Sequence, residues 1–396
     1  MFHPAATPPR LVTLILLTAL ATLSLNLFLP SLAAMAADFD VSYALISLTV
    51  AGYVAVTAAL QLVIGPLSDR FGRRPVLLAA MAVYVIASAA CVMTTDIGVF
   101  LVCRILQGVI IAGWTVSLAI VRDMKPANEA ASTIGYISMV MAVAPMIGPL
   151  AGGLLDAFFG WRASFVAFTL MGLGLLILCW ADLGETNAAR TGGFAAQVRA
   201  YPDLLRSRHF WGYALCMAFS VGAFYAFLAG TPLVATAVFG MSTATLGAAM
   251  GSITAGFVFG SFLSGRLARR HALATMIIAG RLVACIGLAA GLVLVMAGYL
   301  NVVLLFGATI FVGIGNGLTT PSASAGAMSV RPHLAGSASG LFGALTAVVG
   351  ALLTVITGAL VTVETGAFML LAIMLAASFL ALLAALLVRG PGPEEI

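Results

Sequence analysis

Long apolar runs alternate with short polar connections along the whole chain. A helix needs about 20 consecutive apolar residues to cross a bilayer, and twelve runs are near or above that length. They lie at residues 11–33, 44–66, 75–95, 97–121, 132–156, 162–182, 210–234, 245–265, 272–297, 302–327, 335–361 and 365–388. The pattern predicts an all-α membrane protein with 12 transmembrane helices.

The composition excludes a soluble fold. The chain has 396 residues, of which 62% are hydrophobic and 8% charged, whereas soluble domains have about 25% charged and 45–50% apolar residues. The sequence shows no cluster of metal-ligating residues, no nucleophile motif and no sizeable soluble segment. We therefore expect no metal, no cofactor and no enzymatic activity. The net charge of +5 comes from the connections and does not indicate nucleic acid.

Basic residues are distributed asymmetrically between the two sides of the predicted membrane protein. Of the 18 Lys and Arg residues, 15 fall on the side that carries the N-terminus, and Arg162 alone falls on the opposite side. Arg104 and Arg281 fall within spans. Basic connections favour the cytoplasmic side. We therefore expect both termini in the cytoplasm of a bacterium and the spans in its inner membrane.

The longest polar connection divides the chain into two halves of six spans. It covers residues 184–209, between an N-terminal unit at 1–183 and a C-terminal unit at 210–396. A faint repeat supports duplication, because Leu67–Arg74 aligns with Leu263–Arg270 at five of eight positions. Repeated halves of this kind are typical of secondary transporters.

A polar stretch between the second and third spans carries the most specific motif. It reads Gly-Pro-Leu-Ser-Asp-Arg-Phe-Gly-Arg-Arg over Gly65–Arg74. It resembles the G-x-L-[AS]-D-R-x-G-R-[RK] loop of the major facilitator superfamily, which implies the major facilitator fold with two six-helix bundles. The resemblance gives this latch loop a gating role, with Asp69 as its charged hub. The motif residues are Gly65, Asp69, Arg70, Gly72, Arg73 and Arg74.

Arg104 lies inside the fourth span, where a charge normally faces a cavity or a partner. With Gln107 and Gly108 it resembles the R-x-x-Q-G pattern of proton-coupled exporters in the same superfamily. The resemblance implies a role in proton coupling or in the electrostatics of the cavity. The alternative is an arginine whose head group reaches the membrane surface.

The fifth span contains a proline- and glycine-rich element. It resembles the G-P-x-x-G-G element of antiporters in the superfamily and favours export over uptake. Prolines should kink this helix, and glycines four residues apart form a flat face. A generic packing face is the alternative. The residues concerned are Pro145, Gly148, Pro149, Gly152 and Gly153.

The first span resembles the bicyclomycin- and chloramphenicol-resistance (Bcr/CflA) branch of the drug exporters through Phe28, Leu29 and Pro30. That branch commonly has an acidic residue where this chain has Asn26. None of the thirteen carboxylates is clearly at mid-membrane. We therefore expect proton coupling, where present, to use a carboxylate nearer the membrane edge, such as Asp38 or Asp123. The alternative is that the charge of the substrate itself provides the coupling.

The resemblance also suggests which residues line the centre, since spans one, four, seven and ten do so in the superfamily. Aromatic and apolar walls with few polar groups suit bulky amphipathic compounds. The candidates are Asn26, Tyr53, Trp114, Phe224, Tyr225, Phe227 and Asn316.

These observations together predict a multidrug exporter. It moves small hydrophobic or amphipathic compounds out of the cytoplasm by alternating access, in exchange for protons, as a monomer in the lipid bilayer. The alternatives are an uptake or facilitative permease for a metabolite, a membrane enzyme or sensor, and a channel.

Overall fold

The structure is a computed structural model, and all its regular elements within the described part of the chain are helical. It describes residues 9–124, 137, 147–186, 204–267, 270–331 and 335–388. Eleven helices in this part are long and apolar enough to cross a membrane, and Ile147–Phe159 is a shorter apolar helix. The predicted fold class is therefore confirmed. Most of the predicted fifth span lies outside the described residues.

The helices of the first half pack around α3. Their bounds are α1 Leu11–Asn26, η1 Leu29–Ser31, α2 Leu32–Asp38, α3 Tyr43–Phe71, α4 Arg73–Met93, α5 Ile97–Gln107, η2 Gly108–Ile110, α6 Ile111–Met124, the helix Ile147–Phe159 and α8 Arg162–Asp182. Helix α3 contacts α4, α5 and α6, and α4 also packs on α8.

The second half is organised around α10 and α13. Its bounds are α10 Arg208–Leu233, η3 Val234–Val238, α11 Thr243–Leu267, α12 Leu273–Met296, α13 Val302–Ser329, α14 Ala335–Leu360 and α15 Gly366–Leu386. Helix α13 packs between α11 and α12, whereas α10 packs on α14 and α15.

Two predicted spans are interrupted. The first span changes from α1 to the short η1 turn beside Pro30, which lacks the N–H that a continuous helix would use. The fourth span changes from α5 to α6 through η2, which begins at Gly108. A Cβ at Gly108 would lie 2.9 Å from Cγ1 of Val56 on α3, so glycine lets the two helices approach closely.

The latch loop is more helical than the sequence suggests. Helix α3 was expected to end near residue 66, but it continues to Phe71 with Pro66 inside it. Gly72 alone separates it from α4, at a φ of 100° that favours glycine. Gly65 is helical, with nothing within 4 Å of an added Cβ, so it serves neither a turn nor a close approach.

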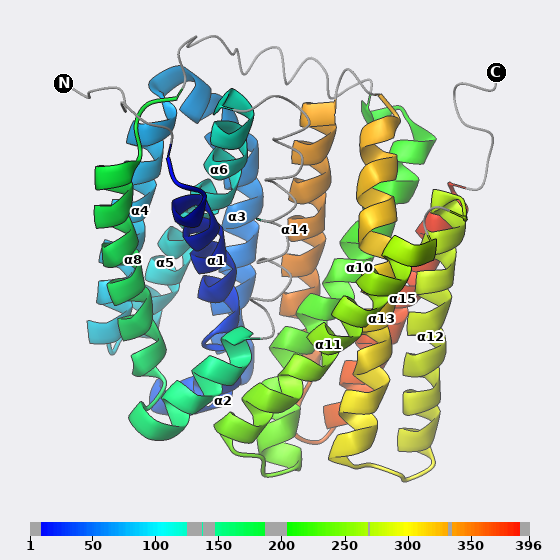
Figure 1. Cartoon of the computed structure of the whole chain (residues 1–396). Helices are drawn as coiled ribbons and strands as arrows, with labels where there is room; N and C mark the ends of the chain where they lie inside the picture. Colours follow the sequence, from blue (N-terminus) through cyan, green and yellow to red (C-terminus); the bar gives the residue numbers. More distant parts are fainter. Residues whose placement is uncertain are drawn as a thin grey trace.

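The two halves meet through two pairs of helices, and Figure 1 shows α14 between α3 and the rest of the second half. Helix α14 packs on α3, and the helix Ile147–Phe159 packs on α11, where a Cβ at Gly247 would overlap the carbonyl of Pro149. The short η1 turn also contacts α10 and α11.

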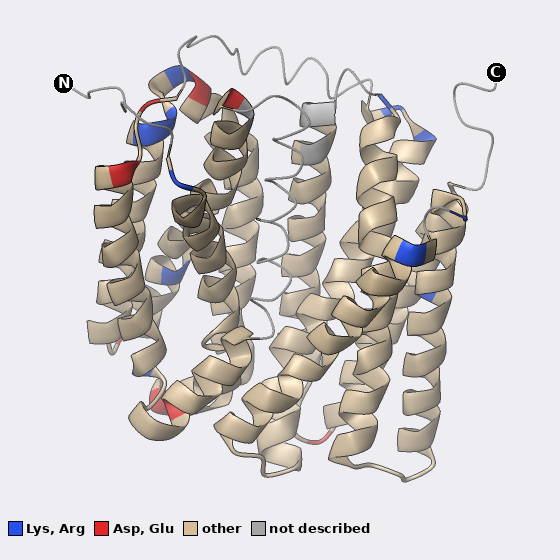
Figure 2. Ribbon diagram, viewed as in Figure 1, with Lys and Arg blue, Asp and Glu red and all other residues tan. Residues whose placement is uncertain are grey.

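Basic residues of the described part gather at one end of the molecule. Figure 2 shows most of the blue segments, which are Lys and Arg residues, toward the end where both termini lie, and few at the opposite end. The latch loop lies at this basic end. This arrangement is the one expected of a membrane protein whose basic end faces the cytoplasm.

Candidate functional site

A cavity of about 410 Å³ lies between the two halves. Its wall comes from four helices, α1 and the second-half helices α10, α11 and α13. The lining residues are Thr22, Leu25, Asn26, Met217, Val221, Phe224, Tyr225, Ile253, Thr254, Phe257, Gly313, Asn316 and Thr320. The polar groups among these are the threonine hydroxyls, the amides of two asparagines and the hydroxyl of Tyr225, and no lining residue is charged, so the cavity suits a mainly apolar molecule.

Asn26 is the amide that the first half contributes to the cavity. Its side chain is 2% exposed, and its Nδ2 donates to the carbonyl of Thr22 at 2.8 Å. Its Oδ1 has no hydrogen-bond partner among the described residues. A buried acceptor without a partner is costly, and a bound molecule carrying an O–H or N–H group would satisfy it.

Asn316 faces Asn26 across the halves and is held by a fully buried arginine. Arg281 on α12 donates to Oδ1 of Asn316 at 2.8 Å and, through Nε, to the hydroxyl of Thr319 at 3.0 Å. Asn316 in turn donates to the carbonyl of Ser220 on α10 at 3.1 Å. The sequence showed Arg281 within a span, but spacing could not reveal this contact, since it joins two different helices.

Arg104 is also fully buried, in the first half. Its guanidinium lies 4.2 Å from the ring centre of Phe28 and 4.9 Å from that of Tyr53, within the range of cation–π attraction. It donates to Gln107, and Gln107 donates to Ser88 at 2.7 Å. The alternative of a surface-reaching arginine is therefore wrong. The R-x-x-Q-G residues form one buried network, in which Ser88 was not anticipated.

Three candidates for the cavity wall lie elsewhere. Tyr53 is buried against α1, where its hydroxyl donates to the carbonyl of Ala21 at 3.1 Å. Trp114 is partly buried and packs on the hydrophobic core. Phe227, fully buried, packs on Phe306 and is likewise absent from the wall. The expectation failed because helical spacing identifies a span but not the face that each side chain takes.

The glycines of the fifth span permit close contacts on two sides of the helix Ile147–Phe159. A Cβ at Gly148 would lie 2.8 Å from Cβ of Asn26, and one at Gly152 would overlap the carbonyl oxygen of Leu27. A Cβ at Gly153 would overlap the carbonyl of Thr243 at the start of α11. The element therefore joins α1 to the second half. Pro145 lies outside the described residues.

Contacts in the latch loop converge on Arg73. Its guanidinium pairs with Asp69, donates to Oγ of Ser68 at 2.6 Å and bonds Oδ2 of Asp123 at the end of α6 at 3.1 Å. Asp69 thus pairs with an arginine, but the group that links α3, α4 and α6 is Arg73. Asp123, a candidate for proton coupling, is held in this ion pair.

Glu185 completes the loop. Its carboxylate accepts from the backbone N–H groups of Arg73 and Arg74 at 2.9 and 3.3 Å, at the N-terminus of α4. A carboxylate at this position satisfies otherwise unpaired donors and complements the helix dipole. Glu185 follows α8 in the sequence, far from the motif at Gly65–Arg74, so the motif could not predict that Glu185 caps α4.

Asp38, the other candidate for proton coupling, lies at the opposite end of the protein. It accepts from Arg162 at 2.6 Å and from the indole N–H of Trp161 at 3.1 Å. Its side chain is 44% exposed, so this is a surface ion pair.

The comparisons with known proteins agree with this geometry. The sequence profile of the Major Facilitator Superfamily matches residues 14–354. The chain belongs to the Major Facilitator Superfamily. It is 31% identical to the chloramphenicol resistance protein of Pseudomonas aeruginosa over 345 residues, which covers 84% of this chain and 81% of that protein. The resemblance to the drug-exporter branch of the superfamily is thereby confirmed.

Two further likenesses extend over nearly the whole chain. An uncharacterized MFS-type transporter of Bacillus subtilis, YdgK, is 30% identical over 361 residues, covering 89% of this chain and 90% of that one. The crystal structure of a bacterial homolog of the human lysosomal transporter Spinster, inward-facing and occupied, superimposes with a TM-score of 0.77 at 18% identity, covering 97% of both chains. This structural likeness confirms the major facilitator fold in a multi-pass membrane protein.

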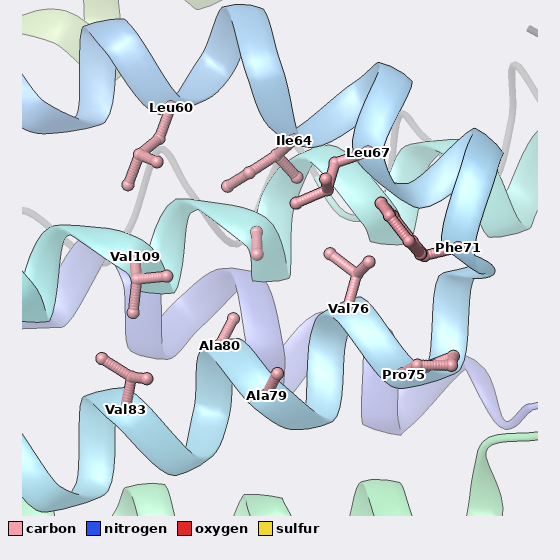
Figure 3. Close-up of a pocket in the computed structure, with 11 residues that line it drawn as sticks. Leu60, Ile64, Leu67, Phe71, Pro75, Val76, Ala79, Ala80, Val83 and Val109 are labelled. Atoms are coloured by element: carbon pink, nitrogen blue, oxygen red, sulfur yellow. The ribbon is translucent and has the colours of Figure 1, made fainter.

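The protein has a second cavity, which lies apart from the central one. Figure 3 shows apolar side chains from α3 and α4, among them Ile64, Phe71 and Val76, around a groove near the latch loop. No charged residue lines this groove. It is a surface that acyl chains can cover, and it contributes no polar group to the central cavity.

Proposed function

We propose that this protein exports small hydrophobic or amphipathic compounds from the bacterial cytoplasm by alternating access, in exchange for protons. The observation that supports this proposal best is the cavity of about 410 Å³ between the halves. Its wall is mainly apolar, and Asn26 and Asn316 contribute amide groups to it. Ligand cavities of this kind have volumes of about 300–1,000 Å³. The relative named for chloramphenicol resistance supports efflux as the direction.

The proposal assigns each part of the chain a place in this cycle. Residues 1–183 and 210–396 are two six-helix bundles joined by the linker 184–209, and they rock about the cavity. Both termini face the cytoplasm, and the protein works as a monomer in the inner membrane, as a transporter and not an enzyme. The contacts of η1 with α10 and α11 join the two bundles next to the end of α1.

A drug-susceptibility panel tests the direction of transport. Expression in a bacterial strain without its own pumps should raise the minimum inhibitory concentration of chloramphenicol at least fourfold over an empty vector. Everted membrane vesicles should release protons from their lumen when chloramphenicol is added. Increased sensitivity to chloramphenicol would instead indicate uptake. Resistance without any proton movement would remove antiport and leave facilitated export.

The latch loop should be sensitive at Arg73 and Asp69. Arg73→Ala removes the link between α3, α4 and α6, and Asp69→Ala removes one of its ion pairs. Contacts that bias two conformations are worth about 1–3 kcal/mol, so each variant should export about 5–150-fold more slowly. The measurement is initial export rate, normalised to the amount of protein in the membrane.

Arg70→Ala is the matched control for this loop. Arg70 is exposed and rests on the ring of Phe71 at 5.3 Å. Its loss should change the export rate by less than a factor of two. Equal loss of export in Arg70→Ala and Arg73→Ala would show that the loop acts through its positive charge and not through the Arg73 contacts.

A further inference from the structure

The central cavity has an uncharged wall with two buried positive charges behind it. Arg281 donates to Asn316, which lines the cavity. Arg104 donates at 3.4 Å to the carbonyl of Ser24, and the next two residues of α1, Leu25 and Asn26, line the cavity. One guanidinium therefore lies behind each half of the site.

Neither positive charge has a carboxylate partner among the described residues. The ion pairs found there involve Arg10, Arg73 and Arg162. The sequences of all four helices that line the cavity, α1, α10, α11 and α13, contain no Asp or Glu. Arginine stays protonated in proteins, so both charges persist.

The cavity therefore has a positive electrostatic potential. Charges that lie in an apolar interior are screened far less than charges at a surface, so their field reaches the neighbouring cavity. Within the part of the chain that the structure describes, each guanidinium also keeps one nitrogen without a hydrogen-bond partner, Nε of Arg104 and one terminal nitrogen of Arg281.

Asn316 connects the positive charge of Arg281 to the cavity wall. Its Oδ1 accepts from Arg281, which draws electron density from the amide and strengthens the donor character of its Nδ2 group. One N–H of that group donates to the carbonyl of Ser220, and the amide can donate a second hydrogen bond.

We infer that this cavity selects its substrates by charge. It accepts neutral and anionic amphipathic compounds and rejects lipophilic cations, and Arg281 is the residue that sets this preference through Asn316. The inference rests on the proposed function, because it takes this cavity as the place where the exported compound binds. Like charges brought together in a desolvated site cost several kcal/mol, which is enough to exclude a cation.

Two ions of nearly the same shape and opposite charge test the inference. Tetraphenylborate and tetraphenylphosphonium are titrated calorimetrically into the purified protein in lipid nanodiscs, with empty nanodiscs subtracted and neutral triphenylphosphine oxide as reference. Tetraphenylborate should bind at least about tenfold more tightly than tetraphenylphosphonium. Equal binding of the two ions, or tighter binding of the cation, would overturn the inference.

Variants of one helix identify the source of the preference. Asn316→Asp puts a carboxylate of nearly the same shape on the cavity wall and should abolish or reverse the preference for tetraphenylborate. Arg281→Gln should reduce it. Asn301→Asp is the control, since Asn301 caps α13 on an exposed surface and aspartate caps equally well. A preference that survives unchanged in Asn316→Asp contradicts the inference, whether or not Arg281→Gln folds.

Chloramphenicol export in cells separates failure of this inference from failure of the proposed function. Export together with equal binding of both ions would refute selection by charge alone. Absence of both export and binding of every probe would refute the cavity as a substrate site, and the inference with it.

Discussion

Gly152→Ala is expected to abolish export. The added methyl group would overlap the carbonyl oxygen of Leu27, and a backbone atom cannot turn aside as a flexible side chain can. Overpacking of this kind costs about 1–3 kcal/mol. Here it would destabilise the contact between the helix Ile147–Phe159 and the end of α1. That contact lies directly beside Asn26, so the first half of the cavity wall is displaced with it.

The measurement for Gly152→Ala is resistance to chloramphenicol in a strain without its own pumps, together with the amount of the variant in the membrane. Gly174→Ala on α8 is the matched control, because nothing lies within 4 Å of a Cβ added there. The variant at Gly174 should export like the wild type. Full resistance in Gly152→Ala would show that the two helices do not need this close approach during transport.

Arg104→Gln is expected to end export without lowering thermal stability. Burying an ion in a protein costs several kcal/mol, whereas a desolvated cation–π contact returns about 2 kcal/mol. Arg104 is fully buried without a carboxylate partner among the described residues, so glutamine should be tolerated or even stabilising at this position. A residue that is retained at a cost to stability is one that function requires.

Two measurements decide whether Arg104 serves function or structure. Export of chloramphenicol should fall by at least about tenfold, since the charge behind α1 is lost. The unfolding temperature in detergent should be equal to or above that of the wild type. Arg162→Gln, which removes an exposed ion pair with Asp38, is the control and should leave export unchanged. A lower unfolding temperature with retained export would make Arg104 a structural residue.

Hydropathy predicted the helices well because each must satisfy its backbone within lipid, which leaves few other solutions. The ends of the helices were predicted less well. Helix α3 continues through polar residues to Phe71, since a helix that reaches the membrane surface no longer needs apolar side chains. The interruptions at Pro30 and Gly108 depend on local backbone chemistry, which a hydropathy window averages away.

The sequence pointed to some of the residues that line the cavity and missed others. Asn26, Phe224, Tyr225 and Asn316 do line the cavity, as the superfamily pattern implied. Tyr53 does not, because its hydroxyl bonds the backbone of α1 and its ring packs on Arg104. Contacts between helices that are distant in sequence, such as Arg281 with Asn316, depend on rotation about each helix axis, and no single span encodes that rotation.

The absence of acidic residues from the four helices around the cavity has an electrical consequence. No carboxylate on these four helices can take up or release a proton to offset the charge of the cargo, so that charge is moved through the membrane voltage. That voltage contributes about 2.3 kcal/mol per elementary charge for every 100 mV. Since the bacterial interior is negative, an anion leaving through this carrier moves in the direction that the voltage favours, and its departure leaves a measurable current.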